Sequence, residues 1–165
     1  MKEHGPAVWQ NCYRLLGNEA DAADCFQETF MCVLELSRCQ EVRSFRSLLV
    51  RVATSRSINR LRRRMRESAR TWNGREAAVV ASPDAGPSEQ AEQQELIWRL
   101  RQALGKLGGQ EAEVFCLRFF EELSYREIAR ELGITTSMAG VLLHRARAKL
   151  RAMLEPAAVS ERSEV

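Results

Sequence analysis

The stretch SYREIARELGITTSMAGVLLHRARAKLRAML, residues 124–154, holds the clearest fold signal in the chain. Ser124, followed three residues later by Glu127, forms a capping box, which predicts that a helix begins at this point. Gly133 is placed to end that helix in a tight turn, and Thr135 is placed to cap the next helix. A short helix, a glycine turn and a second helix with basic residues toward its end together predict a helix-turn-helix.

The second helix of this motif has an apolar side and a polar side. Its apolar residues recur at helical spacing and predict a buried seam: Ala139, Leu143, Ala146 and Leu150. In a helix-turn-helix, the early part of the exposed surface reaches base edges and the later basic part contacts phosphates. We therefore expect contacts with duplex DNA from Thr135, Thr136, Ser137, Val141, His144, Arg145 and Arg147. An ordinary helical hairpin with solvated arginines is the alternative.

The rest of the chain also has helical periodicity and lacks strand-like alternation, so we predict an all-α fold. Before the motif, Gly108-Gly109 separates two amphipathic segments, and the first has Leu96, Leu100 and Leu104 on its apolar side. Further upstream, Gly, Pro, Ser and Ala residues predict a flexible linker. The predicted organisation is a helical domain at 1–67, a linker at 68–93, a second helical domain at 94–154 and a polar tail at 155–165.

The first domain contains two contrasting helices. One begins after Asn18, a plausible N-cap, and has acidic residues in its early turns, where the helix dipole favours them. Its predicted core residues are Ala23, Phe26, Phe30, Val33 and Leu34. The next helix is expected from about Phe45 to Met65, with one buried face formed early in the helix by Phe45, Leu48, Leu49 and Val52.

The end of this second helix, INRLRRRMR at residues 58–66, combines an apolar ladder of Ile58, Leu61 and Met65 with five arginines and no acid. Residues 1–37 have two basic and six acidic side chains, a net −4, whereas residues 38–75 have twelve arginines and two acids, a net +10. Because no acid at i±4 pairs with these arginines, we expect the ladder to hold the helix to the core while the arginines project toward a polyanion. A solvated helix end is the alternative.

Other classes of function have little support in the sequence. Five cysteines without a C-x-x-C pair, together with two histidines, predict free thiols in a reducing compartment and no metal site. We expect a cytoplasmic protein, because neither a signal peptide nor a run of about 20 apolar residues is visible. No nucleophile–base pair or phosphate-binding glycine loop appears, so neither an enzyme nor a cofactor is expected.

Two parts of the chain resemble a known family. LLGNEADAADCFQETFMCVLEL with FRSLLVRVATSRSINRLRRR is similar to the second conserved region of bacterial RNA polymerase sigma factors of the sigma-70 family. EAEVFCLRFFEELSYREIARELGI with LHRARAKLRAML resembles the fourth region. D-x-x-Q-E-T-F at 24–30 and L-S-Y-R-E-I-A at 123–129 occur in the family's order, and no third domain separates them, as in the extracytoplasmic-function (ECF) class. The resemblance implies a bacterial protein that binds core polymerase and directs promoter recognition.

The resemblance also implies roles for individual residues. Asp24, Gln27 and Glu28 match the surface that docks on the clamp coiled coil of the polymerase β′ subunit, and the β flap and an anti-sigma factor are further partners it allows. The residues that match the part that melts and holds the −10 promoter element are Arg43, Ser44, Arg46, Arg51, Ser55, Arg56 and Asn59. Sequence-independent contacts with the phosphates at this element would come from Arg60, Arg62, Arg63 and Arg64. The final helix would read the −35 element. There Gly140 and Leu142 stand where family members commonly have lysine and arginine, which implies an altered contact.

Two other functions remain open at this point. An ordinary helix-turn-helix regulator would bind operators without polymerase, and the acidic helix at residues 19–36 argues against it because such a regulator needs no polymerase dock. A redox-responsive regulator would use Cys25, Cys32 or Cys39 and would show thiol-dependent binding of DNA or partner.

Overall fold

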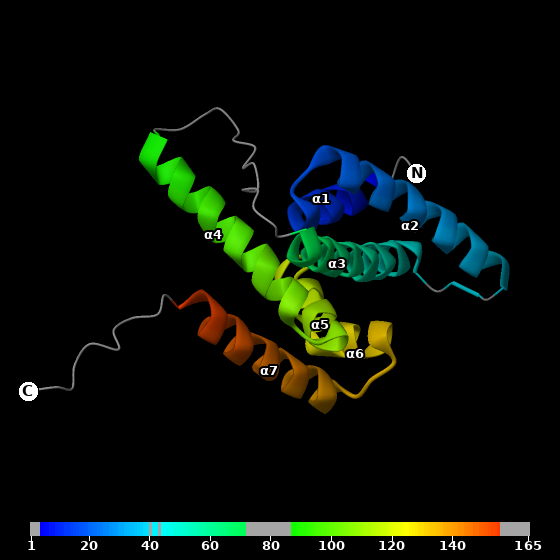
Figure 1. Cartoon of the computed structure of the whole chain (residues 1–165). Helices are drawn as coiled ribbons and strands as arrows, with labels where there is room; N and C mark the ends of the chain where they lie inside the picture. The colour runs from blue at the N-terminus through cyan, green and yellow to red at the C-terminus, as the bar shows by residue number, and fades with distance from the viewer. Residues whose placement is uncertain (1–3, 40, 43, 72–86, 156–165) are drawn as a thin grey trace, which may run out of the picture.

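The computed structural model describes residues 4–39, 41–42, 44–71 and 87–155. These residues form seven α-helices and no β-strand (Figure 1), which confirms the all-α prediction. Arg43 lies outside the described residues. The helices are α1 (Gly5–Leu16), α2 (Glu19–Cys39), α3 (Phe45–Thr71), α4 (Pro87–Lys106), α5 (Gly109–Phe119), α6 (Tyr125–Leu132) and α7 (Thr136–Leu154).

The helix-turn-helix of α6 and α7 forms as its local sequence predicts. The backbone N–H of Ser124 donates to the Glu127 carboxylate at 2.8 Å, and the backbone N–H of Glu127 donates to Ser124 Oγ at 3.3 Å. Gly133 ends α6 with φ of 65°, a left-handed conformation that favours glycine. Thr135 Oγ1 accepts a hydrogen bond from the backbone N–H of Met138 at 3.1 Å and so caps α7.

Helices α3 and α4 are longer than the sequence pattern predicts. Helix α3 continues past Met65 to Thr71, and α4 already begins at Pro87. Both helices therefore extend into the range 68–93 assigned to the linker. Proline is favourable at the first position of a helix because its missing N–H would have no intrahelical partner there. Residues 72–86 lie outside the described residues.

The buried face of α2 is rotated from the predicted one. Ala23 is exposed and the side chain of Leu34 is 58% exposed, so both were wrongly placed in the core. The positions that are buried share one stripe with spacings of three or four residues: Ala22, Cys25, Thr29 and Val33. Two of these buried residues are Cys25 and Thr29, and a search for hydrophobic residues at helical spacing does not count a cysteine or a threonine. The Thr29 hydroxyl is satisfied because it donates to the Cys25 carbonyl at 2.7 Å.

Two other predicted core residues, Phe45 and Leu96, are exposed. Each lies in the N-terminal half of its helix, before that helix reaches the core. Figure 1 shows the N-terminal half of α4 projecting beyond the other helices. Burial begins further along, at Leu48 in α3, while Leu100 in α4 is partly buried against the core.

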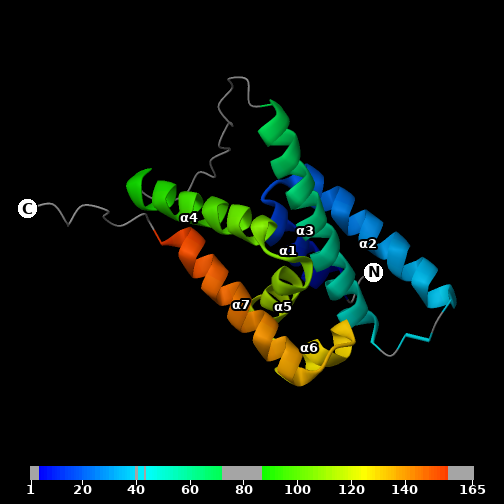
Figure 2. The same ribbon diagram turned by 60° about the horizontal axis from the view of Figure 1, so that its bottom comes forward.

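Helix α3 is the central element of the fold and contacts α1, α2, α4, α5 and α6 (Figures 1 and 2). Its early residues Leu48 and Leu49 pack in a cluster with α1 and α2. Further along, Ile58 and Leu61 are buried in a second cluster with Leu104 and other residues of α4, α5 and α7. The predicted apolar ladder is therefore confirmed, and the surface it packs against belongs largely to the second half of the chain.

Candidate nucleic-acid interface

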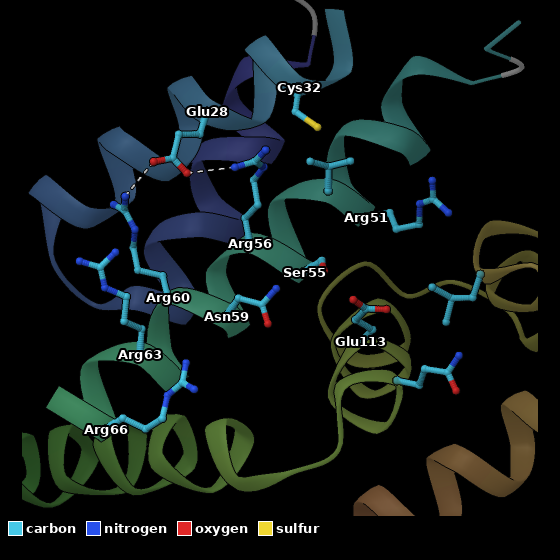
Figure 3. A pocket seen from close by; sticks show the side chains of 13 residues that line it. Glu28, Cys32, Arg51, Ser55, Arg56, Asn59, Arg60, Arg63, Arg66 and Glu113 are labelled. Atoms are coloured by element: carbon cyan, nitrogen blue, oxygen red, sulfur yellow. Dashed lines mark hydrogen bonds and ion pairs between the residues drawn. The ribbon is translucent and has the colours of Figure 1, made fainter. Parts of the chain in front are cut away.

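One exposed side of α3 forms a row of five arginines, the arginine wall: Arg51, Arg56, Arg60, Arg63 and Arg66. They line a cavity of about 790 Å³ together with Ser55 and Asn59 (Figure 3). At about 100° per residue these side chains spread over half of the helix circumference, the half that faces the cavity. Six of the residues predicted for the −10 element thus lie in one cavity. Arg66 is a member of the wall that the sequence reasoning left out, although it lies on the same half of α3.

Acidic residues of α2 pair with the arginine wall. The Glu28 carboxylate accepts hydrogen bonds from Arg56 at 3.1 Å and from Arg60 at 3.0 Å, and Arg60 also pairs with Asp24 at 3.3 Å. The expectation that no acid pairs with these arginines was wrong, because Glu67 pairs with Arg63 at i+4 and further acids come from the neighbouring helix α2. Such partly exposed ion pairs add little stability. Their effect is to orient two guanidinium groups at the rim of the cavity.

Arg62 and Arg64 point away from the wall and contact the ends of other helices. Arg62 donates to the carbonyls of Gly105 at 3.2 Å and Leu107 at 2.6 Å, at the end of α4. Arg64 donates to the carbonyl of Leu16 at 3.1 Å, at the end of α1. A guanidinium group satisfies these carbonyls, which lack intrahelical partners, and complements the negative end of the helix dipole. Arg62 is half-buried, so the prediction that it projects outward was wrong, whereas Arg64 remains exposed with 47% of its side chain accessible.

Arg63 is highly exposed, with 75% of its side chain accessible. Its Nε donates to Glu67 at 2.8 Å, and this hydrogen bond raises the pKa of Arg63. At the start of α3, Ser44 and Arg46 are both exposed, and Ser44 Oγ accepts a hydrogen bond from the backbone N–H of Ser47 at 3.3 Å. These two predicted DNA-binding residues lie outside the set that lines the cavity.

The predicted polymerase-docking residues Asp24, Gln27 and Glu28 lie together on the exposed side of α2. Spacings of three and four residues bring them onto one face. The Asp24 side chain is 67% exposed even though it pairs with Arg60. The acidic face of α2 and the arginine wall of α3 are therefore neighbouring surfaces that meet along a line of ion pairs.

Every residue predicted to contact duplex DNA is exposed on α7 or at its N-cap: Thr135, Thr136, Ser137, Val141, His144, Arg145 and Arg147. The opposite face packs on α5 and α6. Lys149 Nζ donates to both carboxylate oxygens of Glu111 at 2.8 Å, which ties α7 to the first turn of α5. This contact lowers the pKa of Glu111. The motif thus presents its polar surface while its back is fixed to the domain.

Leu142 belongs to the core and not to the exposed face of α7. Its side chain is 6% exposed and lies in a cluster with Leu117 and Ile128. A leucine at this position therefore fills the interior of the domain. Gly140 has open space around it, since a Cβ added there would meet no atom within 4 Å.

All five cysteines are free thiols, and Cys12, Cys25 and Cys116 are buried. Burial raises the pKa of the Cys116 thiol, which disfavours the reactive thiolate. The part of the chain that the structure describes holds no group of three potential metal-ligating residues. Within the same residues, no helix is both long enough and apolar enough to cross a membrane.

The family models agree with this two-part architecture. The model of Sigma-70 region 2 matches residues 1–67 and the model of Sigma-70, region 4 matches residues 97–150. The RNA polymerase sigma factor YlaC of Bacillus subtilis is 33% identical over 142 residues, which cover 86% of this chain and 82% of YlaC. This chain belongs to the sigma-70 family. The sigma factor is also 29% identical to the ECF RNA polymerase sigma factor SigW of Bacillus subtilis over 154 residues, 89% of this chain and 82% of SigW.

A third sigma factor of similar length, CnrH of Cupriavidus metallidurans, is 31% identical over 161 residues, 94% of this chain and 84% of CnrH. The solved structure of the sigma factor RpoE from Bartonella quintana, in complex with the anti-sigma factor NepR, has the same fold. Its TM-score is 0.55 at 20% identity, covering 93% of this chain and 92% of that one. The protein is an ECF sigma factor, a non-enzymatic subunit that acts with core RNA polymerase in promoter recognition and transcription initiation.

Proposed function

We propose that the arginine wall of α3 holds the opened −10 element of the promoter. The observation that carries this proposal is that six of the predicted −10 residues line one cavity (Figure 3). Arginines bind the phosphate backbone without regard to sequence, and their contacts are strongly salt-dependent. Ser55 and Asn59 add hydrogen-bonding groups that can contact the edges of unstacked bases. Ser44 and Arg46 are exposed at the start of α3, outside the cavity, and are further candidates for contact with the −10 element.

The exposed face of α2 is the proposed dock for core polymerase. Asp24, Gln27 and Glu28 offer carboxylate and amide oxygens that suit a basic surface such as the clamp coiled coil of β′. The second half of the chain would contact the β flap. RpoE was solved with the anti-sigma factor NepR, and we include an anti-sigma factor among the partners to be sought by co-purification. The proposed place of action is the bacterial cytoplasm.

Helix α7 is the proposed reader of the −35 element as duplex DNA. Its early exposed residues Ser137 and Val141 can reach base edges, where a valine suits the methyl group of thymine. Arg145 and Arg147 follow on the same helix and can contact phosphates. Gly140 lies within this surface and has no side chain to contact a base, whereas a lysine at this position would provide one.

Run-off transcription with purified core polymerase on a promoter library tests the assignment. We expect initiation at discrete sites only when the protein is added. Asp24→Lys should weaken the polymerase complex, whereas Glu35→Lys, the same change in charge on the same helix, should leave it intact. Replacing Arg56 and Arg63 by alanine should reduce promoter opening without loss of polymerase binding. Absence of protein-dependent initiation, with tight binding to duplex operators alone, would favour an ordinary helix-turn-helix regulator.

A further inference from the structure

Two cysteines of the first domain, Cys12 in α1 and Cys25 in α2, meet in its core. Both are buried, with exposed fractions of 0% and 1%, in the cluster that α1 and α2 form with the start of α3. The two thiols are hydrogen-bonded to each other. Neither residue belongs to the surfaces proposed to bind DNA or polymerase. Two neighbouring thiols in one core are the reactants of a disulfide.

The helical hairpin of α1 and α2 places these two cysteines at similar heights. Helix α1 ends at Leu16 and α2 begins at Glu19, so a short turn joins them, and the two helices pack against each other (Figure 1). At a rise of about 1.5 Å per residue, Cys12 lies about 6 Å before the end of α1 and Cys25 about 9 Å after the start of α2. Such positions on facing sides of packed helices suit the Cα separation of about 4.4 to 6.8 Å that a disulfide requires.

The other cysteines are not placed to pair with Cys25. Cys32 and Cys39 follow it on the same helix by seven and fourteen residues, which corresponds to about 10 Å and about 21 Å along the axis. Cys116 is buried in a different cluster, which centres on α4, α5 and α7. Geometry therefore selects Cys12 as the partner, a residue that the sequence pattern did not single out.

The surroundings favour the thiolate form of Cys25. The hydrogen bond from the Cys12 thiol lowers the pKa of Cys25, and Ser57 and the positive charge of Arg60 act in the same direction, whereas burial opposes them. Cys25 Sγ lies 3.3 Å from Ser57 Oγ in α3. The pKa of Cys12 is raised, because its thiol is hydrogen-bonded to Cys25 and is buried. A thiolate in contact with a second thiol can attack an oxidant and then be resolved by its neighbour.

We propose that hydrogen peroxide converts Cys12 and Cys25 to a disulfide that cross-links α1 to α2 and stabilises the first domain. The Cys25 thiolate attacks one peroxide oxygen and the O–O bond breaks. The products are the Cys25 sulfenic acid and hydroxide, which takes up the proton that Cys25 released. The Cys12 sulfur then attacks the Cys25 sulfur, the S–S bond forms, and the S–O bond breaks as oxygen leaves as water with the proton of Cys12. The two electrons lost by the sulfurs reduce one peroxide to two waters.

The cross-link lies directly beneath the proposed polymerase dock. Asp24 and Glu28 are exposed on α2, next to Cys25 and one turn after it. A disulfide that closes the 14 residues from 12 to 25 restricts the unfolded chain. For a protein of this length, the chain-entropy relation corresponds to a rise in Tm of roughly 6 to 12 °C. The disulfide would keep the dock folded under oxidising conditions, and its formation does not depend on the proposed function.

The test uses the full chain with Cys32→Ser and Cys39→Ser as the background protein. These two cysteines are less buried than the pair and would otherwise react first. Because peroxide reaches a buried thiol only when the hairpin opens locally, the reaction is followed over hours. Each sample is then alkylated and digested with trypsin, which cuts after Arg14 and so separates Cys12 from Cys25.

Two variants of the background protein separate the pair from the other buried thiol. Cys12→Ala removes the resolving thiol. Cys116→Ala is the matched control, because it makes the same change at a buried cysteine of another cluster. Thermal unfolding of each protein is recorded by circular dichroism before and after peroxide, and again after dithiothreitol.

We expect peroxide to link the tryptic peptides of residues 3–14 and 15–38 and to raise Tm by roughly 6 to 12 °C, both reversed by dithiothreitol. Cys116→Ala should behave like the background protein, and Cys12→Ala should show neither effect. Oxidation of Cys25 without a cross-link, a cross-link through Cys116, or a cross-link without a rise in Tm would overturn the proposal. If Cys12→Ala does not fold, the peptides and Tm of the background protein decide. Run-off transcription with the reduced protein tests the proposed function separately, so the failure of either is distinguishable.

Discussion

Arg62 and Arg63 are adjacent, yet the structure predicts that replacing Arg62 by alanine mainly lowers the free energy of unfolding, whereas replacing Arg63 mainly weakens DNA binding. Arg62 makes two charge-assisted hydrogen bonds to carbonyls at the end of α4, and each such bond contributes about 1.5 kcal/mol or more. Arg62→Ala should therefore lower the free energy of unfolding by about 3 kcal/mol. Arg63 makes one exposed pair with Glu67, and pairs of this kind contribute about 0.5 kcal/mol.

Urea denaturation measures this difference directly. For a slope of about 2 kcal/mol per molar urea, the midpoint should fall by about 1.5 M for Arg62→Ala and by about 0.25 M for Arg63→Ala. DNA binding should show the reverse order of effects when log K is plotted against log salt. With single-stranded DNA, Arg63→Ala should reduce that slope by about 0.7, the loss of one phosphate contact. Equal midpoints for the two variants would refute the assignment of Arg62 as a contact between halves.

Three further outcomes follow from the second half of the chain. Lys149 lowers the pKa of Glu111. The pair therefore stabilises the fold at pH values above the ordinary glutamate pKa, and this stabilisation is lost as the pH falls through the lowered pKa. Between pH 6 and pH 3, the urea midpoint should drop more steeply in the wild type than in Lys149→Met. Gly140→Ala should raise the unfolding free energy by about 1 kcal/mol, because space is open and the residue is helical, whereas Gly133→Ala at φ of 65° should lower it by about 1 kcal/mol. Leu142→Arg should cost at least about 3 kcal/mol in thermal or urea unfolding, because it buries a charge in the core.

Features that depend on a few consecutive residues were predicted correctly from the sequence. The capping box at Ser124, the turn at Gly133 and the cap at Thr135 all form as expected. Each is a hydrogen bond or a backbone conformation set within three or four residues, so no knowledge of the rest of the fold is needed. The two family motifs, in their order along the chain, also correctly predicted the order of the two helical units.

Features that depend on neighbouring helices were not predicted. Glu28 pairs with Arg56 and Arg60 across two helices, which a search at i±4 does not consider. The acceptors of Arg62 lie 43 and 45 residues further along the chain. The burial of Cys25 and the exposure of Leu34 were missed for the same reason, because packing against α1 and α3 decides which side of α2 faces inward. The sequence pattern identified the basic helix but not which of its arginines remain accessible.

The distance in sequence between Arg62 and its acceptors also affects how the protein is made. When the ribosome has added Arg62, the 43 to 45 residues that lead to Gly105 and Leu107 are still to be added, which takes roughly 2 to 9 s at usual translation rates. During that interval Ile58 and Leu61 lack the surface that covers them in the finished fold. The nascent chain therefore exposes a helix that is both apolar and positively charged. Such a segment is suited to binding by a chaperone near the exit tunnel.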